Sequence, residues 1–258
     1  MKITSISHCC LLLDLGGKRI LTDPWMTEPL YWGRVFHRYG VGLTIDDLPP
    51  LDLIVASHGH EDHLDPGTLR RLDRTTPVLV LRKAARKVRR LGYSDIYPMV
   101  AGERYAQDGL TVHACFGKHP GGLVTYLLEA GGESVFFAGD TAYHDRLLEV
   151  EQDHGPPDVS LVPISGGRGL FGAVHYHMNP SEAARVAGAL RSRVVIPVHY
   201  HFRFERTPRF LVRSMSVEGK LPQFVRAAAG ICPEVRVVTL GVGQTWESVP
   251  ETGEGEGP

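Results

Sequence analysis

The chain has 258 residues, of which 43% are hydrophobic and 22% are charged, and its formal net charge at pH 7 is -1. These values are ordinary for a globular protein, and the near-neutral charge argues against a nucleic-acid or anionic-membrane partner. No apolar run approaches the ~20 residues that span a bilayer. The start lacks the basic and apolar regions of a secretory signal, so we expect neither secretion nor an integral membrane segment.

The four cysteines indicate a reducing compartment. Cys9 and Cys10 are adjacent, Cys115 and Cys232 are far apart in the chain, and no Cys-x-x-Cys pair occurs. This spacing is not that of a disulfide framework or a thiolate zinc site. The apolar residues that follow Cys9 and Cys10 predict buried, unreactive thiols. We therefore expect a cytoplasmic protein, and the sequence leaves open whether it forms a homo-oligomer.

The N-terminal region predicts short strands followed by an irregular segment. Apolar and polar residues alternate from residue 2, and the runs 9–15 and 18–22 flank a Gly-Gly pair that is typical of a hairpin turn. Residues 23–50 are rich in aromatic side chains and have no regular periodicity. That segment either forms one wall of a substrate pocket or covers the core.

The most informative stretch is His58-Gly59-His60-Glu61-Asp62-His63, which follows the apolar run 53–56. A short apolar run that ends abruptly in polar residues predicts a buried strand, and the loop at its carboxyl end is where α/β proteins usually build their sites. Neutral imidazole and carboxylate are preferred ligands of zinc and its first-row neighbours. Side chains 58 and 60 can face one way while 62 and 63 face another, so one loop can serve two adjacent metals.

The middle of the chain predicts a short helix, a strand and a basic amphipathic helix, and then a series of strands. Asp65-Pro66 supplies a helix N-cap and a proline at the first helical position. Strands follow near 96–100, 110–115, 123–129 and 133–138, separated by turns that contain glycine. The last of them leads into Gly139-Asp140-Thr141, a second carboxylate at the end of a strand.

The later half alternates strand and helix. A strand at 159–163 precedes a glycine-rich loop that contains His177, and a helix begins at Asn179-Pro180. The strand 194–198 ends at His199, a third strand end that carries a metal ligand type. A helix near 221–229 and a strand near 235–240 follow. We expect a single domain over residues 1–245 and a disordered tail over 246–258.

Four motifs in this order resemble the metallo-β-lactamase superfamily. They are His58-x-His60-x-Asp62-His63, a lone histidine further on, Gly139-Asp140-Thr141, and Pro197-Val198-His199-Tyr200. The runs Ile20–Trp25 and His177-Met178-Asn179-Pro180 are similar to the branch that contains ascorbate-phosphate lactonase and N-acyl phosphatidylethanolamine phospholipase D. The resemblance implies an α/β fold, namely a four-layer αββα sandwich with a two-metal site at one edge of the sheets.

The resemblance also implies a ligand set. His58, His60 and a third histidine would hold the first metal, Asp62, His63 and His199 the second, and Asp140 would bridge them. For the third histidine we choose His119, because it lies in a glycine-rich turn between two strands. His113 is the rival, but it lies inside the alternating run 110–115. We expect two divalent ions, with zinc first and manganese or iron as alternatives.

The activity that the resemblance implies is metal-dependent hydrolysis. A dinuclear-metal-activated hydroxide would cleave an ester, lactone or phosphodiester bond in a small, anionic substrate. Asp62 would also orient the nucleophile, and His177 is the first candidate to protonate the leaving group, followed by His201 and Tyr143. The alternative for His177 is a helix-entry residue that bonds to the backbone. His8 is expected to be a core histidine with satisfied hydrogen bonds, although a place in the pocket is the other interpretation.

Arginines follow His199 closely and are interleaved with phenylalanines. Their spacing of three and four residues predicts one helical face, on which Arg203 and Arg206 could bind a phosphate or carboxylate. The alternative is a solvated surface. The group consists of Arg203, Arg206, Arg209 and Arg213.

Two other functions fit part of the pattern. Iron could replace zinc in a redox enzyme on the same scaffold, because imidazole and carboxylate suit both metals. A metal-stabilised protein that binds a metabolite is the non-enzymatic alternative. The chain carries no appended flavin-binding domain, and its full ligand set favours hydrolysis.

Overall fold

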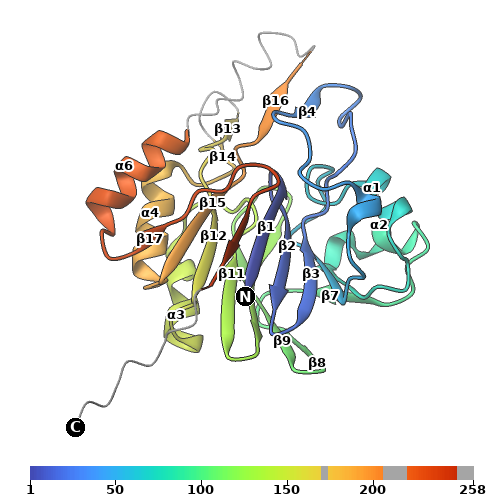
Figure 1. The fold of residues 1–258 in the computed structure, drawn as a ribbon, viewed down its shortest axis with the longest axis horizontal. Coiled ribbons are helices and arrows are strands. Elements are labelled where there is room, and N and C mark those ends of the chain that lie inside the picture. Colours follow the sequence, from blue (N-terminus) through green and yellow to red (C-terminus); the bar gives the residue numbers. More distant parts are fainter. Residues whose placement is uncertain (170–173, 206–219, 249–258) are drawn as a thin grey trace.

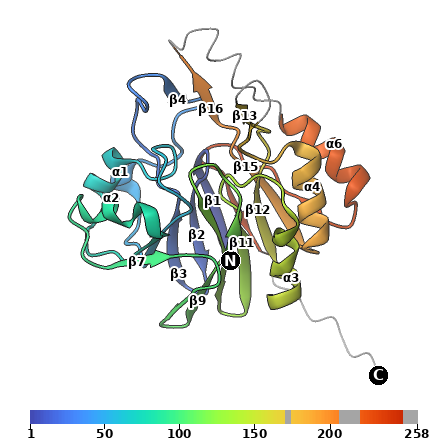
Figure 2. The same cartoon turned by 180° about the vertical axis from the view of Figure 1, so that it is seen from behind.

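The computed structural model describes residues 1–169, 174–205 and 220–248. Two seven-stranded sheets face each other, and helices cover their outer faces (Figure 1). This arrangement confirms the predicted αββα sandwich. Helices α1 (Pro66–Arg71) and α2 (Ala85–Arg89) lie on one side, and Figure 2 shows α3 (Glu149–His154), α4 (Pro180–Ala189) and α6 (Leu221–Ile231) on the other.

The first sheet comes mainly from the N-terminal half, and its strands β3, β5, β6 and β7 are parallel. Strands β5 and β6 are buried along their whole length, as expected for parallel strands covered on both faces. In spatial order the sheet consists of β18 (Thr245–Glu247), β1 (Lys2–Ser7), β2 (Cys10–Leu15), β3 (Lys18–Thr22), β5 (Leu53–Ala56), β6 (Val78–Leu81) and β7 (Ile96–Met99).

The second sheet comes from residues 104–237, and its strands β11, β12, β15 and β17 are parallel. Strands β8 to β10 extend it as an antiparallel meander. In spatial order it consists of β17 (Arg236–Val237), β15 (Val194–Val198), β12 (Val159–Pro163), β11 (Glu133–Phe137), β10 (Leu123–Ala130), β9 (Leu110–Gly117) and β8 (Arg104–Gln107).

Three apolar clusters hold the layers together. The largest lies between the sheets and includes Val55, Leu79, Phe137, Leu161 and Ile196. A second cluster packs α4 and α6 on the second sheet, and a third packs α1 and α2 on the first. Because each sheet is buried on both faces, its loops rather than its faces are available to build a site.

Two small ribbons lie at one edge of the sandwich (Figure 1). Strand β4 (Val35–His37) pairs with β16 (Phe202–Phe204), and β13 (Arg168–Gly169) pairs with β14 (Val174–His175). The remaining elements are the short 3-10 helices η1 (Ile45–Asp47), η2 (Arg82–Ala84) and η3 (Asp145–Leu148).

Strand β18 pairs with β1, so the first sheet extends beyond the domain boundary expected at residue 245. Most of the predicted tail, residues 249–258, lies outside the described residues. Within the described ranges, no helix combines the length and apolar composition that crossing a bilayer requires.

Candidate metal centre

The candidate site lies where the carboxyl ends of strands from both sheets meet. Because β1 runs in the same direction as β3 and β5, and β9 in the same direction as β11, β12 and β15, the residues that follow these strands share one edge. These residues are His8 after β1, Asp23 after β3, Ser57 and His58 after β5, His119 after β9, Asp140 after β11, Ser165 after β12 and His199 after β15.

The first group of donors consists of His58, His60, His119 and Asp140. One donor atom from each of these side chains lies within 4.8 Å of the others. Asp140 Oδ2 is 3.6 Å from Nε2 of His58 and 3.6 Å from Nε2 of His119. His60 is the most accessible member, whereas the other three are buried. The structure therefore brings together the three histidines that were assigned to the first metal.

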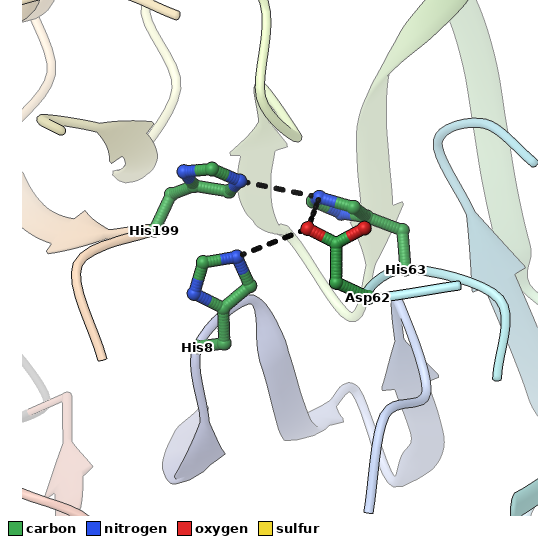
Figure 3. Close-up of side chains that lie close together, drawn as sticks. All are labelled: His8, Asp62, His63 and His199. Carbon is green, nitrogen blue, oxygen red and sulfur yellow. Dashed lines mark hydrogen bonds and ion pairs between the residues drawn. The ribbon is translucent and has the colours of Figure 1, made fainter. Parts of the chain in front are cut away.

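The second group contains Asp62, His63 and His199, and His8 joins it (Figure 3). Nε2 of His63 is 3.3 Å from Nε2 of His199 and 3.7 Å from Asp62 Oδ2. Nε2 of His8 is 3.8 Å from the same Asp62 oxygen. The assignment of His8 as a satisfied core histidine is wrong, because within the part of the chain that the structure describes both of its buried ring nitrogens lack a hydrogen-bond partner.

Asp140 lies between the two groups. Its Oδ2 atom is 3.6 Å from Nε2 of His63 and 3.8 Å from Nε2 of His199, in addition to its contacts with the first group. The preceding Gly139 has a φ of +58°, and a Cβ atom there would lie 2.7 Å from Cβ of Ser57. Only glycine fits this close approach, which fixes how Asp140 enters the site.

Asp23 supports both groups from below, a role that the sequence analysis did not assign to it. Its Oδ1 accepts a hydrogen bond from Ser57 N at 2.7 Å, and its Oδ2 accepts from Ser57 Oγ at 2.8 Å and contacts His63 Nδ1 at 2.5 Å. Because Ser57 donates to Asp23, its oxygen is free to accept from His58 Nδ1, 3.1 Å away. Both histidines are thereby fixed with Nε2 directed at the site, as is typical of metal-ligating imidazoles.

Tyr31 orients Asp62 in the same way. Its hydroxyl donates to Asp62 Oδ1 at 2.5 Å, so that Oδ2 is the oxygen that faces the histidines. The same hydroxyl accepts from Glu61 N at 3.2 Å. Tyr31 comes from the aromatic segment 23–50, and this contact shows that the segment covers part of the site. The sequence signal was only the abundance of aromatic residues there.

Replacing Asp23 with Asn should weaken metal binding by about 10- to 100-fold, the usual effect of losing such an outer partner. Three hydrogen-bond donors converge on the two oxygens of Asp23. An amide presents one oxygen and one NH₂, so at least one of these donors would face another donor instead of an acceptor. Competition with a chelator measures the affinity. The control is Asp153→Asn on the exposed face of α3. Equal affinities in the two variants would contradict the role of Asp23.

Burial and charge leave most of the imidazoles neutral. Burial lowers the pKa of His8, His58 and His199 well below the usual value, and lowers the pKa of His119 to about 4. A neutral imidazole is the form that binds a metal. His63 differs, because the carboxylates of Asp23, Asp62 and Asp140 outweigh the effect of burial and raise its pKa to about 10.

The carboxylates of Asp140 and Asp62, the members of the two groups, have lowered pKa values. Burial alone would raise the pKa of Asp140, but His58 and His63 outweigh it and keep that pKa well below the usual value. The pKa of Asp62 is also lowered, against the effect of burial, by His63 and by the Tyr31 hydroxyl. Buried anions are stable only when cations compensate them.

The donors fit divalent cations. His58 Nε2 and Asp140 Oδ1 are buried and have no hydrogen-bond partner among the described residues, and the same holds for both ring nitrogens of His8. Unpaired buried polar atoms are rare, and each indicates a missing partner. Nitrogen and oxygen donors at this spacing suit zinc, iron or manganese. Each group offers enough donors for one ion.

His177 lies against the centre. Its Nε2 is 3.5 Å from Asp140 Oδ2, and its Nδ1 is 2.9 Å from Ser165 Oγ. The alternative interpretation expected this ring to bond to the backbone. The ring bonds to a side chain instead. Ser165 Oγ is also 2.9 Å from His199 Nδ1, and the sequence analysis did not single out this serine. It follows a parallel strand of the second sheet, which is the only signal that the sequence offered.

The other predicted site residues have partners of their own. Tyr143 donates to Asp145, and His201 packs against Tyr39 and Tyr200. The structure places His113 inside β9, beside Glu129. Among the described residues, none of Tyr143, His201 and His113 is a member of the two groups.

The helical face predicted for the arginines is wrong at Arg203. This residue lies in β16, which pairs with β4 far away in the sequence, so tertiary pairing overrides the local spacing. Its guanidinium contacts Glu205 at 3.1 Å and lies over the ring of Phe36. Arg206, Arg209 and Arg213 lie outside the described residues.

Comparisons with known proteins agree with this geometry. A model of the Beta-lactamase superfamily domain matches residues 18–200. An N-acyl-phosphatidylethanolamine-hydrolyzing phospholipase D 1 of Caenorhabditis elegans is 27% identical over 271 residues, covering 95% of this chain and 75% of the relative. A metal-dependent hydrolase of Caldivirga maquilingensis is 25% identical over 201 residues, covering 76% and 80%.

A solved structure shows the same fold. The isothiocyanate hydrolase from Delia radicum gut bacteria has a TM-score of 0.77 and 17% identity, over 96% of this chain and 99% of that one. The matched family span includes seven of the eight residues in the two groups, all except His8. On this match and on the fold, the chain belongs to the metallo-β-lactamase superfamily.

Proposed function

We propose that this metal-dependent hydrolase holds two divalent cations, zinc before manganese or iron, and cleaves an ester, lactone or phosphodiester bond in a small, anionic substrate. The observation that carries the proposal is the pair of donor groups that meet at Asp140. When bound, two such cations lower the pKa of water toward neutrality and polarise a substrate oxygen. The two donor groups that meet at Asp140 would hold these cations side by side.

The protein's own residues divide the remaining work. Tyr31 holds Asp62 so that one carboxylate oxygen faces the centre, where it can orient a water molecule. Asp23 and Ser57 fix the rings of His63 and His58. Fixed positions matter because misplacement by about 1 Å can cost 100-fold in rate.

Ser165 determines where the proton on His177 resides. If His199 binds a metal through Nε2, its Nδ1 carries hydrogen and donates to Ser165 Oγ. The serine hydroxyl is then free to donate to His177 Nδ1, which leaves the hydrogen of His177 on Nε2. That atom faces Asp140 at the centre. His177 is thus prepared to donate a proton to a leaving group, the role proposed for it.

The bond type rests on relatives as well as on chemistry. The Caenorhabditis elegans relative is named as a phospholipase D that hydrolyses N-acyl-phosphatidylethanolamine, and the Caldivirga maquilingensis relative is named as a metal-dependent hydrolase. An anionic substrate is supported by the two cations and by the partly exposed Arg203 beside β4. Arg206 stays a prediction, since it lies outside the described residues.

Metal analysis followed by an activity screen tests the proposal. We expect two equivalents of a divalent metal per chain and turnover of a generic phosphodiester, lactone or thioester. Turnover should disappear after chelation and return on adding the metal. A coloured, iron-containing protein that consumes oxygen and hydrolyses none of these would show redox chemistry instead. Metal binding without any turnover would support the non-enzymatic alternative, a metal-stabilised protein that binds a metabolite.

A further inference from the structure

The turn between β1 and β2 places a histidine inside the second donor group. His8 follows β1 at the same edge as the other ligands, with 3% of its surface exposed. Figure 3 shows its ring facing Asp62, with His63 beyond that carboxylate, and the ring of His199 lies beside that of His8, with 4.0 Å between their centroids. One donor atom from each of these four side chains lies within 4.8 Å of the others.

The separations match donors that share one cation. Donors bound tetrahedrally to zinc at about 2.0–2.1 Å are about 3.4 Å apart. The measured separations are 3.3 Å for His63 and His199, 3.7 Å for His63 and Asp62, and 3.8 Å for His8 and Asp62. Nε2 of His8 is therefore nearly as close to Asp62 Oδ2 as Nε2 of His63 is.

The described residues 1–169, 174–205 and 220–248 give the ring nitrogens of His8 no hydrogen-bond partner. Both ring nitrogens are buried and unpaired, and the ring lies edge-on to Trp25 and Phe202. An unpaired polar group in such surroundings destabilises the fold unless something binds it.

The backbone holds the ring in place at a conformational cost. His8 has a φ of 37°, in the left-handed region, and its carbonyl oxygen accepts from His199 N at 3.3 Å. Such strain concentrates at functional sites.

We infer that His8, through Nε2, is a further ligand of the cation held by Asp62, His63 and His199. The inference rests on the proposed function, but it adds a ligand that the family span of residues 18–200 does not contain. With Asp140 between the two groups, His8 brings the second cation to five protein donors, whereas the first has four. The second cation is then the more enclosed, and the cation at His58, His60 and His119 keeps more room for water or substrate.

Titration of the metal-free chain with Zn²⁺ tests the inference. We use His8→Phe, which keeps a ring, and His8→Asn, because asparagine tolerates left-handed backbone. By calorimetry the unaltered protein should bind two equivalents. Both variants should bind the first normally and the second at least about 100-fold more weakly. Without metal, His8→Phe should melt at a higher temperature than the unaltered protein, because the unpaired nitrogens are gone.

His144→Phe is the matched control, since both ring nitrogens of His144 are also buried without a partner, outside the two groups. It should bind two equivalents normally. Histidine ring-nitrogen NMR of the unaltered protein gives a second measurement that does not depend on the variants folding. Adding Zn²⁺ should shift the His8 Nε2 signal, assigned through ring contacts with Trp25 and Phe202.

An unshifted His8 signal, or unchanged affinity for both equivalents in the two variants, would overturn the inference. Either result would leave the proposed function intact, because turnover and two bound ions in the unaltered protein would persist. Failure of the unaltered protein to bind any Zn²⁺ would instead overturn the proposed function, and this ligand assignment with it.

Discussion

Replacing Asp140 with Asn should lower turnover by at least about 100-fold, the upper end of what the loss of a metal's outer partner costs. Oδ2 of this carboxylate lies between 3.5 and 3.8 Å from Nε2 of five histidines. Asparagine has the same shape but no charge, and it turns an NH₂ toward the donors. Both cations should therefore bind more weakly, with the loss visible in metal content as well as in rate.

Two comparisons separate this effect from a general loss of structure. Circular dichroism should show an intact fold, since asparagine fills the same space. Asp153→Asn, on an exposed face of α3, should keep full activity and both metals. If Asp140→Asn retained two tightly bound ions, Asp140 would not lie between them, and its assignment to both donor groups would be incorrect.

Removing one ligand from each group should abolish turnover by two distinguishable routes. His60→Ala should lose the metal at His58 and His119, and Asp62→Ala should lose the metal at His63 and His199, because the donor sets do not overlap at these residues. Each variant should keep about one equivalent of metal. His60 is the least buried member of its group, so its truncation leaves no large cavity in the core.

Metal content and activity are measured on the same preparations. His175→Ala, in exposed β14 and outside both groups, is the control and should retain both metals and full rate. Near-full activity in both His60→Ala and Asp62→Ala would refute the site assignment. Loss of both metals from either single variant would show instead that the two groups bind cooperatively.

The fold could be predicted because its signals are local. The uniformly apolar run of β5 and the Asn179-Pro180 start of α4 each specify their element within a few residues. The seven candidate ligands could be named by resemblance, since their motifs stand at strand ends in a fixed order, and the structure brings their donor atoms together. His119 rather than His113 follows from the same logic, because His113 lies within a strand and cannot reach its end.

The supporting residues could not be predicted, because their roles depend on strand order. Asp23 and Ser165 become neighbours of the ligands only when β3 lies beside β5 and β12 beside β15. Nothing near His8 in the sequence shows that β1 ends at the same edge. The arginine prediction was wrong at Arg203 for the converse reason, since spacing describes a helix and β16 instead pairs with a strand more than 160 residues earlier.

Each donor group draws on both sheets. His58 and His60 follow a strand of the first sheet, whereas His119 and Asp140 follow strands of the second, and the other group is divided in the same manner. A bound ion would thus link the two sheets of the sandwich. Whatever binds only the folded state stabilises it by mass action, so we expect removal of the metal to lower the melting temperature of the protein as well as its rate.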